Sequence, residues 1–238
     1  MRPTIVLVHG AFAESASWDR VIRHLEDAGH AVIAAANPLR GLAADAQSVT
    51  DLVSAVDGPI VLVGHSYGGA VITNVDANAG EITGLVYVAA FAPEAGESAN
   101  ALAQRFPGST LGGALRPVHR SNGTTDLYID RAIFHTQFAA DVPTGEAARM
   151  AATQRPVTLE ALQAPCGERP LWKQVPSWFL IAGQDRNIPA ELQLFMAHRA
   201  RARRTVELPT ASHAAAVSHP DATARLVLEA VSRVPVVA

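Results

Sequence analysis

Cysteine is nearly absent from this 238-residue sequence, in which Cys166 is the single cysteine. One cysteine cannot form an internal disulfide, and Cys166 lacks the spaced Cys or His companions that a zinc site requires. Neither sign of charge prevails, because 19 Lys and Arg residues stand against 22 Asp and Glu residues, which gives a net charge of −3. The composition therefore gives no electrostatic reason to expect nucleic acid or an anionic membrane as a partner.

Long apolar runs are missing as well, and none approaches the ~18 residues that a membrane-spanning helix needs. The apolar stretch near the start, residues 5–8, is much shorter than the core of a secretory signal, so we interpret it as a strand and expect a cytoplasmic protein. No G-x-G-x-x-G follows a predicted strand, and the sequence has no Walker loop and no H-E-x-x-H. Nucleotide binding and metalloprotease chemistry therefore have no support.

Apolar residues are plentiful, at 49% of the sequence against 17% charged, which is enough for a buried core. The length favours one large domain, residues 1–238. Short β-branched runs alternate with longer amphipathic segments, which predicts an α/β fold with a mostly parallel sheet flanked by helices. We predict six strands, at residues 4–8, 31–35, 59–63, 85–89, 178–182 and 205–208. The predicted helices are residues 17–28, 43–56, 67–79, 189–202 and 220–231.

The alternation breaks between about residues 93 and 176, a segment too long for a plain connection between strands. We call this insertion the cap segment. It contains several aromatic residues that a disordered linker would lack, namely Phe106, Tyr128, Phe134, Phe138 and Trp172. We therefore predict a small helical cap over the carboxyl ends of the strands.

A glycine-rich motif follows the third predicted strand directly, with the sequence Gly64-His65-Ser66-Tyr67-Gly68-Gly69, and a predicted helix begins at once. This strand, sharp turn and helix are the context of a nucleophile elbow. The serine of such an elbow takes a strained backbone conformation, and small residues on either side let the strand and the helix approach closely. A plain glycine turn whose serine caps the helix is the alternative, but the context favours Ser66 as a nucleophile.

A serine hydroxyl needs a base to take its proton and a third group to orient that base. Asp185 follows the fifth predicted strand and His213 follows the sixth, so both are candidates for these roles. Asp185 has an alternative role as a turn former or as the partner of Arg186. His219 competes with His213, but it precedes Pro220 at a predicted helix start, whereas His213 lies in the loop just after a strand.

Hydrolysis by such a serine also needs two backbone N–H groups that stabilise the developing negative oxygen. We expect one from Tyr67, directly after the nucleophile, and the other from the loop after the first strand, where Ala11 is the first choice and Phe12 the second. His9, at the end of that strand, is interpreted as an internal hydrogen-bonding residue of the loop.

Aromatic side chains are candidates for an apolar substrate pocket, although they are more often ordinary core residues. These candidates are Phe12, Trp18, Tyr67, Phe134, Phe138 and Trp172.

The chain resembles the α/β-hydrolase superfamily over essentially its whole length in five features, namely the run Val8-His9-Gly10-Ala11-Phe12, Trp18, the elbow at 64–69, Asp185 and His213. Within the superfamily it is similar to the group that contains plant methyl esterases, hydroxynitrile lyases and their bacterial relatives. The resemblance implies a serine-triad hydrolase without cofactor or metal.

Two departures from this group bear on the reaction. Its hydroxynitrile lyases carry a threonine where this chain has Gly10, and a lysine after the catalytic histidine where this chain has Ala214. Both departures favour ester hydrolysis. Haloalkane dehalogenases carry an aspartate as the nucleophile, so Ser66 argues against them, whereas cofactor-free haloperoxidases and carbon–carbon bond hydrolases share the triad and stay open.

We therefore expect a serine esterase that cleaves a small, largely apolar carboxylic ester or lactone through an acyl-enzyme. A ligand-binding receptor on the same fold, with a slow or vestigial triad, is one alternative, and a hydroxynitrile lyase or haloperoxidase is another. The sequence leaves the acyl and alcohol groups open. It also leaves the oligomeric state open, with a homodimer among the alternatives.

Overall fold

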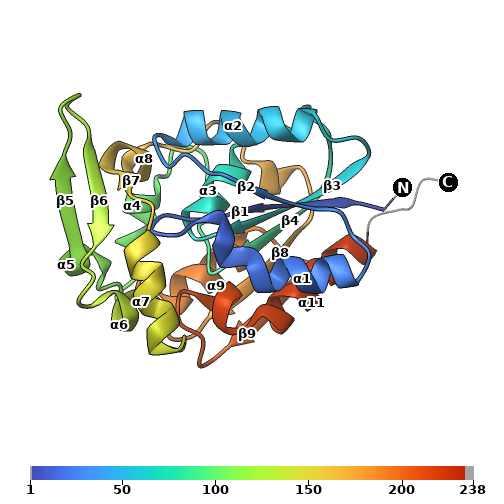
Figure 1. Ribbon diagram of the computed structural model, residues 1–238. Helices are drawn as coiled ribbons and strands as arrows, with labels where there is room; N and C mark the ends of the chain where they lie inside the picture. Colours follow the sequence, from blue (N-terminus) through green and yellow to red (C-terminus); the bar gives the residue numbers. More distant parts are fainter. Residues whose placement is uncertain (1, 234–238) are drawn as a thin grey trace.

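Six parallel strands form the central sheet of the protein, in the spatial order β2-β1-β3-β4-β8-β9 (Figure 1). The computed structural model describes residues 2–233 of the chain. The strands are β1 (Thr4–Val8), β2 (Val32–Ala35), β3 (Pro59–His65), β4 (Glu81–Val88), β8 (Ser177–Ala182) and β9 (Arg204–Leu208). All six predicted strands are confirmed. The central strand β3 is buried along its whole length, as its run of Ile, Val and Leu predicts for a strand covered on both faces.

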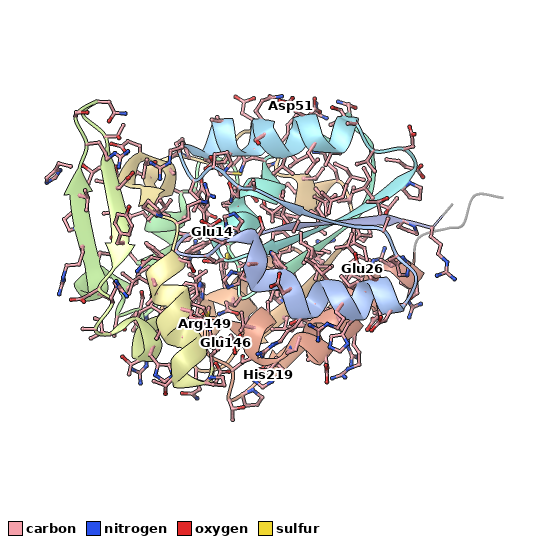
Figure 2. The ribbon with its side chains drawn as sticks, viewed as in Figure 1. Glu14, Glu26, Asp51, Glu146, Arg149 and His219 are labelled. Atoms are coloured by element: carbon pink, nitrogen blue, oxygen red, sulfur yellow. The ribbon has the colours of Figure 1, made fainter. Side chains whose placement is uncertain are left out.

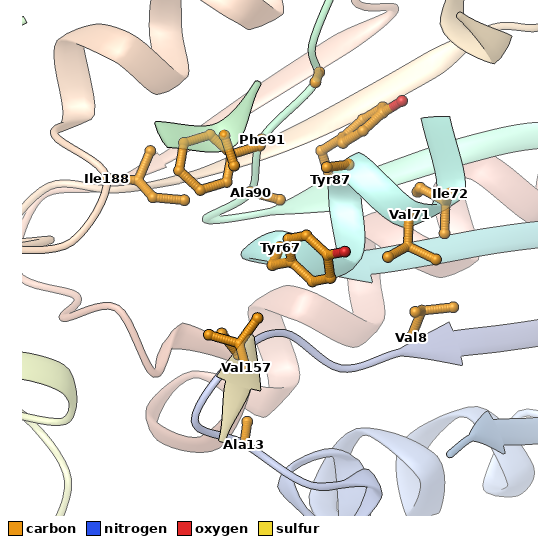
Figure 3. Packing of buried hydrophobic residues seen from close by; sticks show 14 of the residues in the cluster. Val8, Ala13, Tyr67, Val71, Ile72, Tyr87, Ala90, Phe91, Val157 and Ile188 are labelled. Carbon is orange, nitrogen blue, oxygen red and sulfur yellow. The ribbon is translucent and has the colours of Figure 1, made fainter. Parts of the chain in front are cut away.

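Helices cover both faces of this sheet, which confirms the expected α/β fold. One face carries η1 (Ser15–Trp18), α1 (Asp19–Asp27), α10 (Ala215–Ser218) and α11 (Pro220–Ser232), whose apolar residues share one buried cluster with Trp178. The other face carries α2 (Leu42–Ser54), α3 (Tyr67–Thr73) and α9 (Ala190–Arg199), and Figure 1 shows α2 across the sheet from α1 and α11. Figure 3 shows part of this second cluster, with Tyr67, Phe91 and Ile188 among its members.

The helix predicted over residues 67–79 ends early, at Thr73. The Thr73 hydroxyl donates to the Gly69 carbonyl oxygen at 2.8 Å, and the Asn74 side-chain amide donates to the Ala70 carbonyl oxygen at 2.8 Å. Side chains that bond to nearby backbone carbonyls in this way compete with the helix.

The cap segment contains the helices that the sequence predicts and, in addition, strands that it does not predict. Its helical elements are α4 (Ala99–Ala103), α5 (Leu111–Ala114), α6 (Phe134–Phe138), α7 (Thr144–Thr153), α8 (Leu159–Gln163) and η2 (Leu171–Lys173). They accompany a three-stranded antiparallel sheet of β5 (Leu115–His119), β6 (Thr125–Ile129) and β7 (Val157–Thr158). Because β5 is mostly exposed, it has no apolar run, although Asn122-Gly123 between β5 and β6 is a hairpin signal.

The sheet topology brings the predicted site residues to one edge. The strand order changes direction between β1 and β3, and loops at such a switch point commonly bind ligands in α/β folds. Val8 pairs with Gly64, so the loop that follows β1 lies beside the turn that follows β3. The strands β8 and β9 run parallel to them and end at the same edge, ahead of Asp185 and His213.

A membrane-spanning helix is not found within residues 2–233, where no helix combines the required length with the required apolar character. The cytoplasmic location stays a prediction.

Candidate active site

Ser66 stands at the sharp turn between β3 and α3, with φ 55° and ψ −124°. A positive φ is costly for any residue other than glycine, so the surrounding structure must hold this turn in place. The end of β4 does so, because Ser66 N–H donates to the Val88 carbonyl oxygen at 3.3 Å and Phe91 N–H donates to the Ser66 carbonyl oxygen at 3.1 Å. A Cβ atom at Gly64 would lie 2.6 Å from the Gly68 carbonyl oxygen, so the turn requires a glycine there. The strained turn that the motif predicts is present.

Asp185 and His213 form a buried pair, with 7% and 1% of their surfaces exposed. His213 Nδ1 lies 2.7 Å from Asp185 Oδ2. Because an ionised carboxylate only accepts hydrogen bonds, the proton of a neutral His213 lies on Nδ1, which leaves a lone pair on Nε2. The imidazole therefore has the tautomer that a general base for a serine needs.

His65 links the Ser66 turn to the His213 loop. Burial, together with the neighbouring His213, lowers the pKa of His65 to about 3, so this ring is neutral. Its Nε2–H donates to the His213 carbonyl oxygen at 2.9 Å, and the two ring centroids lie 4.8 Å apart. Within residues 2–233, no direct hydrogen bond joins the Ser66 hydroxyl to the His213 ring. Such contacts often tighten only when substrate binds.

The sequence leaves two alternatives open, namely Arg186 as the partner of Asp185 and His219 in place of His213. Neither residue belongs to the buried pair. Arg186 uses its carbonyl oxygen to accept from the side chain of Gln137 at 2.9 Å, and among the described residues no ion pair joins it to Asp185. His219 lies near the surface, with a third of its side chain exposed and its Nε2 3.3 Å from Asp141 Oδ2 (Figure 2). Of the two histidines, His213 is therefore the one that pairs with Asp185.

The loop after β1 passes directly over Ser66. A Cβ atom at Gly10 would lie 3.1 Å from Ser66 Oγ and closer still to Ser66 Cβ. Phe12 N–H is already engaged, because it donates to the Arg155 carbonyl oxygen at 3.0 Å. Across residues 2–233, the N–H groups of Ala11 and Tyr67 have no hydrogen-bond acceptor, and Tyr67 begins a helix, where N–H groups lack intrahelical partners. The geometry therefore favours Ala11 over Phe12 as a donor to an oxyanion.

His9 is fully buried and both of its ring nitrogens are hydrogen-bonded. Its Nε2 accepts from the Asn37 backbone N–H at 3.1 Å, and its Nδ1–H donates to the Gly10 carbonyl oxygen at 3.0 Å. Burial is the main cause that lowers the pKa of His9 below its ordinary value, which suits a neutral ring with this pattern. His9 thus supports the loop internally, as the sequence suggests.

Among the aromatic pocket candidates, Phe138 lies against the buried pair. Its ring meets the His213 ring edge to face, with centroids 4.8 Å apart, and Phe134 stacks on Phe138 at 5.0 Å. Both belong to α6, so this helix of the cap segment covers the imidazole with apolar surface.

Within residues 2–233, no ring contact joins the other aromatic candidates to His213. Trp18 is fully buried in the cluster with α1 and α11. Trp172 donates its indole N–H to the Pro93 carbonyl oxygen at 2.8 Å. Phe12 lines a cavity of about 370 Å³ between α1 and α7, together with Glu146 and Arg149, which Figure 2 labels.

The cap segment also holds the backbone on both sides of His213, which the sequence did not predict. Ser212 N–H donates to Asp141 Oδ2 at 3.0 Å, and the Ser212 hydroxyl donates to Asp141 Oδ1. Ala214 N–H donates to the Phe138 carbonyl oxygen at 3.0 Å. No sequence signal identifies these contacts, because they depend on how the cap segment folds back onto the sheet.

Comparison with known proteins gives curated relatives, two of which match over half of their own length or less, and solved structures of the same fold. The "Carbendazim hydrolyzing esterase" of Nocardioides sp. (strain SG-4G) is 38% identical over 110 residues, a match that covers 41% of this chain and only 46% of that protein. Methylesterase 8 of Arabidopsis thaliana is 30% identical over 138 residues, which cover 49% of this chain and 50% of that protein. The crystal structure of polyneuridine aldehyde esterase superposes with a TM-score of 0.81 at 18% identity, over 96% of this chain and 99% of that one.

The sequence model of the Alpha/beta hydrolase family matches residues 5–226, which is most of the chain. It spans the turn at Ser66, the buried pair of Asp185 and His213, and the whole cap segment. The chain therefore belongs to the alpha/beta hydrolase family.

Proposed function

We propose that the protein is a serine esterase that hydrolyses small, largely apolar carboxylic esters or lactones through an acyl-enzyme. The observation that carries this proposal is the buried hydrogen bond between His213 and Asp185, joined through His65 to the strained turn at Ser66. The relatives named as a methylesterase and as a carbendazim-hydrolysing esterase support an ester-like substrate.

In the proposed mechanism, Ser66 Oγ attacks the carbonyl carbon of the ester while His213 Nε2 takes the hydroxyl proton. Asp185 holds the Nδ1–H and stabilises the imidazolium that forms. The N–H groups of Ala11 and Tyr67 donate to the carbonyl oxygen as it becomes an oxyanion. Collapse of the tetrahedral intermediate expels the alcohol, which receives the proton from His213. Water then attacks the acyl-enzyme, with His213 again taking and returning a proton.

We further propose that the chain is one domain in which the cap segment encloses this site. The edge of Phe138 against His213, backed by Phe134, supports an apolar surrounding for the substrate. Such a surrounding excludes water and strengthens the electrostatic contacts that stabilise the oxyanion.

The two departures from hydroxynitrile lyases lie at the site and support hydrolysis. A Cβ atom at Gly10 would lie 2.5 Å from Ser66 Cβ, so a threonine there would require the loop or the serine to move. Ala214, which stands where those lyases carry a lysine, is 2% exposed. A lysine would bring a charge into this buried position, at a high cost unless it were paired.

A panel of p-nitrophenyl esters of increasing acyl length tests the proposal. We expect wild-type turnover to be abolished by Ser66→Ala and by His213→Ala, since loss of either residue in a working triad costs about 10⁶-fold in kcat. His219→Ala is the matched control and should keep turnover, because His219 pairs with Asp141 outside the proposed triad. A fluorophosphonate should label the wild type at Ser66, and mass spectrometry should find no adduct on Ser66→Ala.

Other results would overturn the proposal. Saturable ligand binding without turnover of any ester would support the receptor alternative. Product from a cyanohydrin, or from halide, peroxide and acid, at rates that exceed ester turnover would support a lyase or a haloperoxidase.

A further inference from the structure

Gln193 is a buried glutamine of α9 that touches the acidic member of the proposed triad. It is 1% exposed. Its side-chain NH₂ group donates to Asp185 Oδ2 at 2.9 Å and to the Ile188 carbonyl oxygen at 2.6 Å. Its side-chain oxygen accepts from the N–H of Ala182, the last residue of β8, at 3.0 Å. The amide thus joins the end of β8, the loop that follows it, and the carboxylate.

The Asp185 carboxylate receives four hydrogen bonds, which fills its usual capacity. Oδ1 accepts the backbone N–H groups of Asn187 and Ile188, at 2.7 and 2.9 Å. Oδ2 accepts from His213 at 2.7 Å and from Gln193 at 2.9 Å. The backbone therefore holds Oδ1. Within residues 2–233, Gln193 is the group besides His213 that holds Oδ2, the oxygen on which the imidazole depends.

We infer that Gln193 is a positioning residue, which keeps Asp185 Oδ2 directed at His213 Nδ1 and so maintains the tautomer and orientation of the proposed base. This inference rests on the proposed function. Without the Gln193 donor, the imidazole is the one hydrogen-bond donor left to Oδ2 among residues 2–233, and the carboxylate can pivot about Oδ1, which the backbone holds. The carboxylate and the ring then move together, and Nε2 spends less time aligned with the Ser66 hydroxyl. Because Gln193 is buried on α9, substrate affinity should change little while kcat falls.

Gln137 offers a matched control because its side chain bonds to the same loop from another element. It is also buried, at 6% exposed, and it lies on α6 of the cap segment. Its side-chain NH₂ group donates to the Arg186 carbonyl oxygen and to Asn187 Oδ1, both at 2.9 Å, and its oxygen accepts from Thr110 at 2.8 Å. Gln137 therefore makes three hydrogen bonds around the loop, as Gln193 does, but none to the Asp185 carboxylate.

The test compares Gln193→Met with Gln137→Met, since methionine keeps the approximate volume of glutamine and removes its hydrogen bonds. For Gln193→Met we expect kcat on a p-nitrophenyl ester to fall about 10- to 100-fold, the range typical for residues that orient a functional side chain from behind. KM should stay within about twofold, a split between kcat and KM that general loosening would not give. Gln137→Met should keep kcat near the wild-type value.

Proton NMR gives a readout that does not depend on turnover. The proton on His213 Nδ1, in a buried 2.7 Å hydrogen bond, should give a low-field signal in the wild type and in Gln137→Met. In Gln193→Met this signal should shift or broaden by exchange with water. Should Gln193→Met fail to fold, Gln193→Asn replaces it, because it keeps an amide but withdraws it from Asp185 by one methylene.

An unchanged kcat and an unchanged low-field signal in a folded Gln193 variant would overturn the inference. An equal loss of kcat in the Gln193 and Gln137 variants would also overturn it, because the cause would then be loosening of the loop. Failure of the proposed function is distinguishable from both results. It would appear as wild-type turnover no greater than that of Ser66→Ala, while the NMR comparison would still report whether Gln193 holds the buried pair.

Discussion

Replacement of Asp185 by asparagine tests the proposed mechanism sharply, because the surrounding donors fix how the new amide must turn. Asp185 Oδ1 accepts two backbone N–H groups, from Asn187 and Ile188, at 2.7 and 2.9 Å. An amide oxygen can accept these bonds and an NH₂ group cannot, so the oxygen takes that side. The NH₂ group then faces His213 Nδ1 and donates to it. The proton of the imidazole moves to Nε2, which can no longer accept the proton of Ser66.

We expect Asp185→Asn to lower kcat by about 10⁴-fold, as the same change does in a well-studied serine triad. At about 1.36 kcal/mol per factor of ten, this loss corresponds to about 5 kcal/mol of transition-state stabilisation. In the wild type, the side-chain NH₂ group of Gln193 donates to Asp185 Oδ2. In the variant, the NH₂ group of the new asparagine takes the place of Oδ2, so two donors face each other. A buried donor left without an acceptor costs about 1–3 kcal/mol, so the free energy of unfolding should fall by a similar amount.

The assays are p-nitrophenyl acetate turnover and urea unfolding, on wild type and variant in parallel. Asp130→Asn is the control, because Asp130 Oδ2 lies 2.6 Å from the Arg116 guanidinium at a partly exposed site of the cap segment. This variant should keep both the kcat and the unfolding midpoint of the wild type. A folded Asp185→Asn variant with kcat within tenfold of the wild type would refute the argument from the tautomer.

Two further substitutions test the loop over Ser66 and the buried hydrogen bond between Tyr67 and Asp45. Gly10→Ala should destabilise the fold by about 1–3 kcal/mol in urea unfolding and lower ester turnover, because its Cβ atom would lie 2.5 Å from Ser66 Cβ. Gly112→Ala, whose Cβ atom meets nothing within 4 Å, should do neither, and equal effects would contradict this reasoning. Tyr67→Phe removes the hydroxyl that donates to Asp45 Oδ2 at 2.9 Å. Burial already raises the pKa of Asp45, so its contribution to stability falls as pH rises through that pKa. The stability cost of Tyr67→Phe should therefore be larger at pH values above this raised pKa than at more acidic pH, and a cost independent of pH would count against a charged Asp45.

The central sheet was predictable because its strands carry a strong local pattern. Residues 59–63 form an apolar run that only a strand buried on both faces explains well, and β3 is such a strand. The sheet of the cap segment was missed because β5 is mostly exposed and has no such run. Its hairpin turn at Asn122-Gly123, where Gly123 has φ 86°, was the available local signal.

Candidate residues of the site were predictable where strand ends carry them. Ser66, Asp185 and His213 each follow a parallel strand, and the ends of such strands meet at one edge of the sheet. Gln193 and Asp141 carry no comparable signal. Each acts through a hydrogen bond to a residue of another element, and such a bond depends on tertiary packing rather than on local sequence.

The contacts around His213 also limit how substrate can enter. The cap segment bonds to the backbone on both sides of His213, through Asp141 and Phe138, and the Phe138 ring covers the imidazole. Lifting α6 away would therefore release the proposed base together with its cover, at the moment when substrate needs it in place. An entrance between α1 and α7 would leave these bonds intact. The cavity of about 370 Å³ between these helices is lined by Phe12, which follows the expected oxyanion donor Ala11 in the sequence, but neither Ser66 nor His213 lines it. A path from this cavity to Ser66 would therefore need Phe12 or its neighbours to move, while the bonds of the cap segment to the His213 loop stay in place.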